Sequence, residues 1–533
     1  MCDLLDDDFL AVLDVNTSGE FAAHFHALEV IDFTTYLAIG LYFAVLLVIG
    51  RLAYNKKSNL NEYLLDNRSL GPFMTALSAG ASDMSGWMLL GLPGALYLSG
   101  ICNAWIAIGL SIGAWANYKY LASRLRVYTE ISGDSITIPD YLENRFKDRT
   151  KVLRIISGIF ILVFYTLYVS SGIIAGGKTF ESFFGIDFIF GAGLTLFIVV
   201  FYTFFGGFKA VCLTDAFQGI LMFLVLVCIP LVAYFSIDIP EGSSFFALLN
   251  EYSHAANYDH LNIFAGQTFL GILGLLAWGF GYFGQPHIIV RFMAIRDAKE
   301  LSSARRIGIS WMVIGLVGAM ASGLIGFVYF SQNGITLSDP ETVFLKLGDT
   351  LFHPFIVGVI ISAVLAAIMS TISSQLLVSA SSVTRDFIFA FYKHEVSDRA
   401  QVLTGRISVM IVAVIATIIG FNSSDTVLGV VGNAWAGFGA SFGPVLLFSL
   451  YSRHMSALSA LAGIITGGVT VLLWILFGLS SIVYELLPAF LLSSLVIWLV
   501  NRYNNMLKRM SQEPNLSIID DEFNKMRDKQ SRL

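Results

Sequence analysis

Charged residues are scarce in this chain of 533 residues and make up 13% of it, about half the share found in soluble domains. The four cysteines are too scattered for a disulfide framework or a zinc site; they are Cys2, Cys102, Cys212 and Cys228. A GxxxxGK[ST] phosphate-binding motif is absent, so the sequence does not indicate an ATP-driven pump. A net charge of −6 disfavours binding to nucleic acid.

Hydrophobic residues are abundant instead, at 56% of the chain, with a mean hydropathy of +0.73. This composition excludes a disordered chain and predicts one all-α, polytopic membrane domain. A helix needs about 20 mostly apolar residues to cross a bilayer. Thirteen segments meet that description, and we expect spans near 34–53, 71–98, 101–121, 153–178, 186–206, 211–236, 267–290, 308–331, 353–380, 405–421, 426–451, 456–478 and 480–501.

The distribution of lysine and arginine predicts the orientation of these spans. With the N-terminus outside, every lysine and arginine except Lys178 and Lys346 falls in a cytoplasmic segment, as basic residues do in membrane proteins. The first 33 residues are acidic and contain no lysine or arginine, so they do not form a signal peptide. The sequence therefore predicts an acidic extracytoplasmic extension over 1–33, a transmembrane domain over 34–502 and a cytoplasmic tail over 503–533.

Two of the predicted spans contain residues that interrupt helices. The second holds the run SAGASDMSGW at 78–87, and the seventh holds WGFGYFGQP at 278–286. Glycine and proline weaken a helix, and a broken helix survives in a membrane only where it lines a cavity or is buried in protein. Interrupted spans in corresponding places predict two five-helix repeats, spans 2–6 and 7–11, with a transport site between them. Glycines for close helix packing are the alternative, but they do not account for the carboxylate of Asp83.

Three polar features mark candidate site residues. Asp83 lies in mid-span with no basic residue within a dozen positions, which favours a functional role. Asp215 lies near the start of the sixth span and is compatible with simple helix capping. In the ninth span, Ala367, Ser370 and Thr371 share one helical face. Their oxygens suit a bare sodium ion, although such hydroxyls in a membrane also form hydrogen bonds between helices.

Five sequence runs together resemble the sodium:solute symporter family. In chain order they are RSLGP (68–72), SAGASDMSGWMLLGL (78–92), GYFGQPHIIVR (281–291), AAIMSTISSQL (366–376) and AWAGFGA (434–440). The similarity extends from about residue 34 to about residue 505, and within the family it is closest to bacterial members that import proline. Two departures are the N-terminal extension and Ser374, which stands where some relatives carry cysteine.

The resemblance implies a leucine-transporter-like core of two inverted five-helix repeats. It implies a sodium site made of the carbonyls of Ala81, Met84 and Ala367 and the hydroxyls of Ser370 and Thr371, with Asp83 supporting coupling. The proline pocket that it implies consists of Trp87, Gly91, Tyr168, Trp278, Tyr282 and Pro286. Arg68 and Asp215 match positions that support transport in the family.

The expected function is a sodium-coupled secondary symporter that imports L-proline across the bacterial cytoplasmic (inner) membrane. We expect no enzymatic activity, no use of ATP and no obligatory protein partner. Alternatives are a symporter for another small organic solute and a proton-coupled symporter with Asp83 as the proton carrier. A membrane-bound solute sensor is disfavoured, because the tail after residue 502 is too short for a signalling domain.

Overall fold

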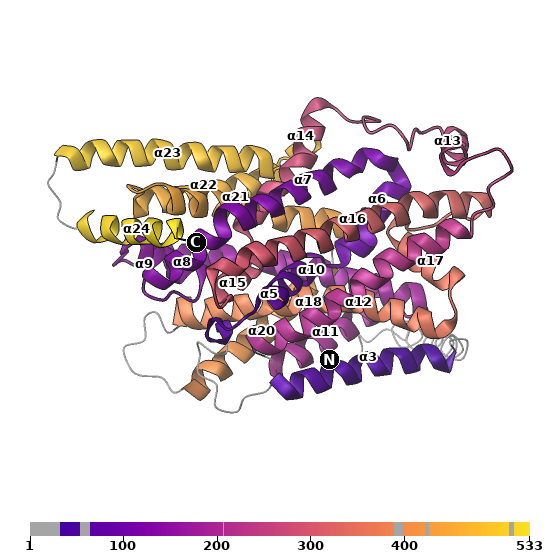
Figure 1. The fold of residues 1–533 in the computed structure, drawn as a ribbon, viewed down its shortest axis with the longest axis horizontal. Helices are drawn as coiled ribbons and strands as arrows, with labels where there is room; N and C mark the ends of the chain where they lie inside the picture. Colours follow the sequence, from indigo (N-terminus) through magenta and orange to yellow (C-terminus); the bar gives the residue numbers. More distant parts are fainter. Residues whose placement is uncertain are drawn as a thin grey trace, which may run out of the picture.

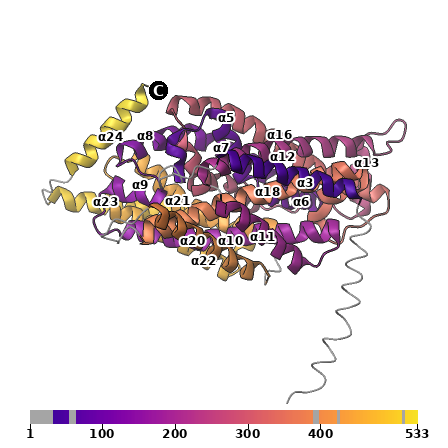
Figure 2. The ribbon, with the colours of Figure 1, turned by 90° about the horizontal axis from the view of Figure 1, so that it is seen from below.

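The computed structural model describes residues 32–53, 64–205, 207–388, 398–421, 426–510 and 516–532. Over these ranges all regular structure is helical, and the one β feature is an isolated bridge between Leu70 and Ile295. The long helices run side by side along the longest axis of the molecule (Figures 1 and 2). Such packing follows from the apolar composition, because a helix satisfies its backbone hydrogen bonds internally without water.

The first half of the chain contains α3 (Phe33–Ala53), α5 (Pro72–Asp83), α6 (Leu92–Ser99), α7 (Ala104–Ala116), α8 (Ser123–Ile131), α9 (Ile138–Phe146), α10 (Val152–Phe184), α11 (Phe188–Phe205), α12 (Phe208–Phe235) and α13 (Phe245–Ala255). The second half contains α14 (Phe269–Ala277), α15 (Pro286–Ala294), α16 (Leu301–Gln332), α17 (Val343–Leu351), α18 (Pro354–Ser381), α20 (Asp398–Phe421), α21 (Val427–Tyr451), α22 (Ala457–Leu476), α23 (Leu486–Met510) and α24 (Leu516–Ser531).

Ten helical stretches of the described chain are long and apolar enough to cross a membrane, and two shorter apolar helices lie at Phe188–Val200 and Phe269–Gly284. Each of the thirteen predicted segments overlaps one or more of the helices above. The difference in number arises from the segments at 71–98, 186–206 and 267–290. Helical breaks or a short apolar stretch keep these three from qualifying as separate continuous spans.

Both predicted helix interruptions are confirmed. Helix α5 ends at Asp83, Met84 leaves helical geometry with ψ 74°, and a π-helical turn, η2 (Trp87–Gly91), leads into α6. Helix α14 passes into a 3-10 segment, η5 (Trp278–Gly284), and Gln285 is extended (φ −85°, ψ 103°) before α15 begins. The glycines of η5 allow neighbouring groups to approach closely, since a Cβ on Gly281 would lie 1.8 Å from Trp435 Nε1.

The described part of the C-terminal tail folds back onto the helical domain. Helix α24 lies beside α8 at one end of the molecule (Figure 2). Its Lys529 forms an ion pair of 3.2 Å with Glu130, and its Glu522 accepts a hydrogen bond of 2.7 Å from Lys147. The tail thus contains an ordered helix, which the sequence did not lead us to expect.

Candidate functional site

The break after α5 frees a backbone carbonyl that a hydroxyl on α18 then reaches. Ser85 N donates to Asp83 O (2.9 Å) instead of to Ala81 O, its partner in a regular helix. Ser370 Oγ lies 2.8 Å from Ala81 O and 3.2 Å from Ala367 O. Three of the five predicted sodium ligands therefore meet at one point between α5 and α18, and all three residues are buried.

The two remaining predicted ligands lie on the same elements. Thr371 follows Ser370 on α18, is 2% exposed, and its Oγ1 has no hydrogen-bond partner among the described residues. Met84 is fully buried at the break itself. A buried hydroxyl without a partner is costly, so the oxygen of Thr371 is a suitable ligand for a cation.

Asp83 lies at the end of α5 and contacts the second broken helix. It is 3% exposed, and Tyr282 OH donates to its Oδ2 over 2.5 Å. Its Oδ1 has no partner among the described residues. Asp83, Tyr282 and Asn117 line a cavity of about 20 Å³, which is large enough for one water molecule.

Aromatic rings surround the break of the second helix. The ring centroids of Trp87 and Trp278 are 6.5 Å apart, and those of Tyr282 and Trp435 are 5.0 Å apart in an edge-to-face arrangement. Trp435 Nε1 donates to Trp278 O over 2.8 Å, which satisfies a carbonyl of the 3-10 segment. The structure thus brings together three of the six residues predicted for the substrate pocket, and α21 contributes Trp435 as a further one.

The other three predicted pocket residues lie nearby but have separate packing partners. Tyr168 on α10 is 1% exposed and its ring centroid lies 5.9 Å from that of His287 on α15. Gly91 faces the start of α21, where a Cβ would come within 2.9 Å of Leu428 Cβ. Pro286 is the first residue of α15 and lines a narrow cavity on the side of this helix that faces α9.

A buried ion pair lies next to these two breaks, and it corrects one expectation. Asp215 does not cap α12, because that helix begins at Phe208 and Asp215 is two turns inside it with 0% exposure. Its partner is Arg291 (3.1 Å), the first residue after the predicted seventh span, which is 1% exposed. Asp215 also accepts from Ser78 Oγ over 2.7 Å.

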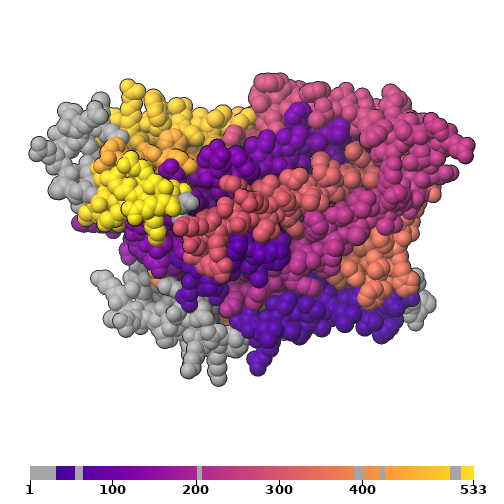
Figure 3. All heavy atoms as spheres, viewed as in Figure 1, coloured from indigo at the N-terminus to yellow at the C-terminus, as the bar shows by residue number. Residues whose placement is uncertain are grey.

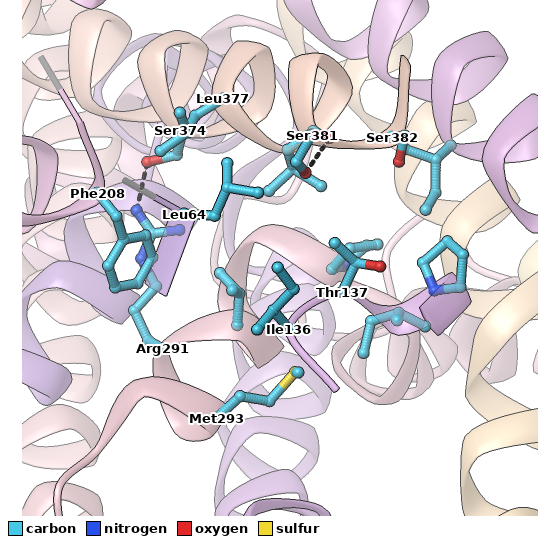
Figure 4. Close-up of a pocket in the computed structure, with 16 residues that line it drawn as sticks. Leu64, Ile136, Thr137, Phe208, Arg291, Met293, Ser374, Leu377, Ser381 and Ser382 are labelled. Carbon is cyan, nitrogen blue, oxygen red and sulfur yellow. Dashed lines mark hydrogen bonds between the residues drawn. The ribbon is translucent and has the colours of Figure 1, made fainter. Parts of the chain in front are cut away.

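Arg291 links four helices through its guanidinium group. It donates to Ser78 Oγ on α5 (3.1 Å), to Asp215 on α12 and to Ser374 Oγ on α18 (2.5 Å), as well as to His287 O on its own helix (2.5 Å). Figure 4 shows Arg291 and Ser374 pointing toward each other at one end of the cavity that Pro286 also lines. Burial of these charged groups requires that they be paired.

Arg68 fixes the chain that precedes α5. It donates to Ser135 O (3.0 Å) and Met293 O (2.8 Å), and it forms an ion pair of 2.9 Å with Asp134. The bridge between Leu70 and Ile295 lies beside it. Arg68 therefore joins the beginning of α5 to the end of α15 and does not lie among the predicted ligands.

Sequence reasoning missed Arg291, Ser78, Ser374 and Trp435 as members of the site. All four lie within the sequence runs that carry the family resemblance, and that position was an available signal. The contacts of Ser78 and Ser374 could not be predicted from it, because they depend on Arg291 reaching between helices that are far apart in the sequence.

Two discontinuous helices that meet at buried polar groups within a bundle of apolar helices define a membrane transporter. The sequence profile of the sodium:solute symporter family matches residues 63–467. The chain therefore belongs to the sodium:solute symporter family, which consists of transporters and not of enzymes.

Curated relatives cover nearly the whole chain. The high-affinity proline transporter PutP of Bacillus subtilis (strain 168) is 50% identical over 487 residues, which cover 91% of this chain and 100% of the relative. Sodium/proline symporter 2 of Staphylococcus saprophyticus is 50% identical over 480 residues, or 88% of this chain and 93% of the relative. The sodium/proline symporter of Staphylococcus aureus (strain JH9) is 47% identical over 512 residues, or 93% and 96%.

Solved structures support the fold. A Na⁺-coupled sialic acid symporter in a substrate-bound, outward-open state superposes with a TM-score of 0.73 at 19% identity, covering 89% of this chain and 98% of its own. The nucleobase-cation-symport-1 family transporter Mhp1, in a closed conformation, gives a TM-score of 0.51 at 13% identity, covering 88% and 99%. At these identities the similarity concerns the architecture alone.

Proposed function

We propose that this protein is a symporter that couples the inward flow of sodium to the import of L-proline across the cytoplasmic membrane of a bacterium. Support comes from relatives with 47–50% identity that are named as proline transporters or sodium/proline symporters. The observation that carries the proposal is the meeting of Ser370 Oγ with the freed carbonyl of Ala81 across the break of α5. A broken helix that offers free backbone oxygens beside hydroxyls is how such transporters bind sodium.

The proposed sodium site uses the carbonyls of Ala81, Met84 and Ala367 and the hydroxyls of Ser370 and Thr371. Sodium is a hard cation that prefers oxygen ligands. When sodium is bound, Ser370 Oγ would coordinate the ion through a lone pair, and its hydrogen would turn away from the carbonyl of Ala81. Asp83 contributes the negative charge that makes entry of a cation into this buried region favourable, and we assign it to coupling.

The proposed proline pocket consists of Trp87, Gly91, Tyr168, Trp278, Tyr282 and Pro286. Proline has an apolar ring, a carboxylate and a ring amine. The rings of Trp87, Trp278 and Tyr282 provide the apolar surface. The N–H groups of His287, Ile288 and Ile289 donate to Tyr165 OH and Gln285 O, so it is the positive end of the helix dipole of α15 that favours an anionic group such as the carboxylate.

We further propose the finer topology that the sequence predicts. The core is leucine-transporter-like, with thirteen membrane helices, and spans 2–6 and 7–11 form inverted repeats. The extension 1–33 lies outside, 34–502 is the transmembrane domain, and 503–533 is a cytoplasmic tail. Lys178 and Glu341 form an ion pair of 2.6 Å, in agreement with an external location of both. Arg68 and Asp215 support transport by positioning the half-helices.

The experiment that tests this function is uptake of radiolabelled L-proline by the purified protein in proteoliposomes. An inward sodium gradient should drive accumulation, and an equal potassium gradient should not. Unlabelled L-proline should compete, whereas an excess of an amino acid with an acyclic side chain should compete poorly. Failure of sodium to stimulate uptake would contradict the proposed coupling ion, and competition by acyclic amino acids would contradict the proposed solute.

Proton coupling is the second candidate, and the environment of Asp83 favours it. Among the described residues this carboxylate contacts no basic group, and it lines the cavity of about 20 Å³ together with Asn117. A carboxyl group in such a place is able to exchange a proton with a bound water molecule. Uptake driven by a pH gradient in sodium-free buffer would support this alternative and contradict sodium coupling.

A further inference from the structure

A groove opens on the outer surface between α5, α12 and α16. These three helices lie side by side at the centre of the view in Figure 1, and Figure 3 shows the same face with all atoms. The groove has a volume of about 520 Å³. Its walls are almost entirely apolar and include Phe73, Leu77, Ile220, Phe223 and Ile314. Helices α12 and α16 are both long and apolar enough to span a membrane, so the groove faces the hydrocarbon region.

The floor of the groove is Trp311, which separates it from the proposed sodium site. Trp311 Nε1 donates to Gly219 O over 3.0 Å, so the ring is fixed against α12. A Cβ on Gly80 would lie 3.0 Å from the ring, and a Cβ on Gly219 would lie 3.4 Å from the side chain of Ala81. A molecule in the groove would therefore press on α5 one side chain away from a proposed sodium ligand.

One end of the groove carries positive charge. Arg306 and Ser310 line it, one helical turn apart on α16, and both are exposed. Within the described parts of the chain, neither Arg306 nor its neighbour Arg305 forms an ion pair or a side-chain hydrogen bond. Both lie in the second turn of α16, in a segment that the distribution of lysine and arginine along the sequence assigns to the cytoplasmic side. An apolar groove that ends at an available arginine is complementary to a long apolar chain with an anionic head.

We propose that this groove binds one anionic phospholipid of the cytoplasmic leaflet. Its phosphate contacts Arg306 and the Ser310 hydroxyl, and an acyl chain lies along Leu77, Phe223 and Ile314 over Trp311. Anionic lipids are concentrated in that leaflet and attract lysine and arginine near the membrane surface. An apolar helix of a partner protein fits the walls but leaves the charge of Arg306 without compensation. The bound chain holds the first turns of α5 in place, because Phe73 and Leu77 belong to that half-helix.

Quenching of tryptophan fluorescence by brominated lipids tests this proposal. The purified full-length protein in a neutral detergent is titrated with phosphatidylglycerol or phosphatidylcholine, each brominated on its acyl chains. The fluorescence that Trp311 contributes is the difference in emission between wild type and Trp311→Phe. We expect phosphatidylglycerol to quench this contribution at a concentration about fivefold lower than phosphatidylcholine, as one arginine contact predicts.

Two variants test whether the anionic lipid binds in this groove. Arg306→Gln should remove the difference between the two lipids, and the fold should tolerate this change because Arg306 is exposed. Arg502→Gln alters another exposed arginine, whose contact among the described residues is a cation–π interaction with the ring of Trp498, and it should leave the preference unchanged. Equal quenching by both lipids in wild type, or a preference that survives in Arg306→Gln, would overturn the proposal. Absence of Trp311 quenching by either lipid would also overturn it and would indicate that protein covers the groove.

Discussion

The two broken helices differ in length, in polarity and in what surrounds the break. The first break takes only Met84 and Ser85, and it leaves a carboxylate and a free carbonyl beside the hydroxyls of α18. The second extends over the seven residues Trp278–Gly284 and Gln285, and it is packed among aromatic rings. A short polar break presents oxygens to an ion, whereas a long aromatic one forms a surface for an organic solute. In the proposed function, the first break supplies the ion ligands, and the second break supplies Trp278 and Tyr282 to a solute pocket that Trp87 and Gly91 of the first helix complete.

Two side-chain hydrogen bonds join the broken helices to each other. Tyr282 OH donates to Asp83 Oδ2, and Arg291 Nε donates to Ser78 Oγ. A change in one half-helix on binding therefore alters the partners of the other. Such a shared contact is the physical requirement for coupling between two sites. Substitutions that remove contacts between the two broken helices should therefore have larger effects than substitutions at one break alone.

The largest expected effect is on stability, from Arg291→Gln. This change leaves Asp215 buried without a cation, and breaking a buried pair costs about 3–5 kcal/mol. We expect the purified variant to unfold at a clearly lower temperature than wild type. Fluorescence-detected size-exclusion chromatography after heating measures this loss of thermal stability. The double variant with Asp215→Asn should recover much of the loss. The control Arg296→Gln removes an exposed pair with Glu300 and should have little effect; equal stability of Arg291→Gln and this control would contradict the prediction.

The second prediction is that Asp83→Asn lowers sodium-driven proline uptake at least about tenfold, which corresponds to a loss of roughly 1.4 kcal/mol. Asparagine keeps the size of the side chain and accepts the hydrogen bond from Tyr282, so the fold should persist. Only the negative charge is removed. Uptake is measured in proteoliposomes at low sodium concentration.

Tyr282→Phe is the matched control for this change, since it removes the hydrogen bond but keeps the charge of Asp83. It should reduce uptake less than Asp83→Asn does. Wild-type uptake by Asp83→Asn at low sodium would remove this carboxylate from the coupling site.

The third prediction concerns the two hydroxyls of α18. Ser370→Ala and Thr371→Ala each remove one proposed sodium ligand, at a cost of about 1–1.5 kcal/mol. The sodium concentration for half-maximal uptake should therefore rise roughly five- to tenfold, while alanine preserves the helix. Ser379→Ala is the control, because Ser379 Oγ donates to Gln375 O of its own helix over 2.8 Å and to no other group among the described residues. If the sodium curve does not move in either ligand variant, the site lies elsewhere.

The sequence predicted the two breaks and one face of α18 because these features are local. Small residues around Asp83, and glycines before Pro286, weaken a helix wherever they occur. The spacing of Ala367, Ser370 and Thr371 places them on one face of any helix. The spans were predicted by the same kind of argument, from the hydropathy of short windows.

The ion pair of Arg291 could not be predicted in this way. Its partner Asp215 is 76 residues away in the sequence, and hydropathy alone ended the seventh span just before Arg291. The role of Trp435 could not be predicted either, because a tryptophan in an apolar helix has the same pattern as any residue of the hydrophobic core. Its role depends on the carbonyl of Trp278, which is available only because η5 is not a regular α-helix.

The smallest expected effect comes from Trp435→Phe, and it tests the aromatic side of the comparison. Phenylalanine keeps an apolar ring but loses the N–H group that donates to Trp278 O over 2.8 Å. Loss of one such hydrogen bond costs about 0.5–1.5 kcal/mol, and we expect roughly threefold weaker proline binding. The sodium dependence should stay unchanged, because Trp435 contacts the second break and not the first. Trp105→Phe is the matched control, since its Nε1 donates over 3.0 Å to Ile263 O, which lies in the loop before α14 and not in either break. Proline competition measured at saturating sodium, and sodium titration at saturating proline, separate the two effects. A shift of the sodium curve in Trp435→Phe equal to that of the proline curve would contradict the division between an ion-binding and a solute-binding half-helix.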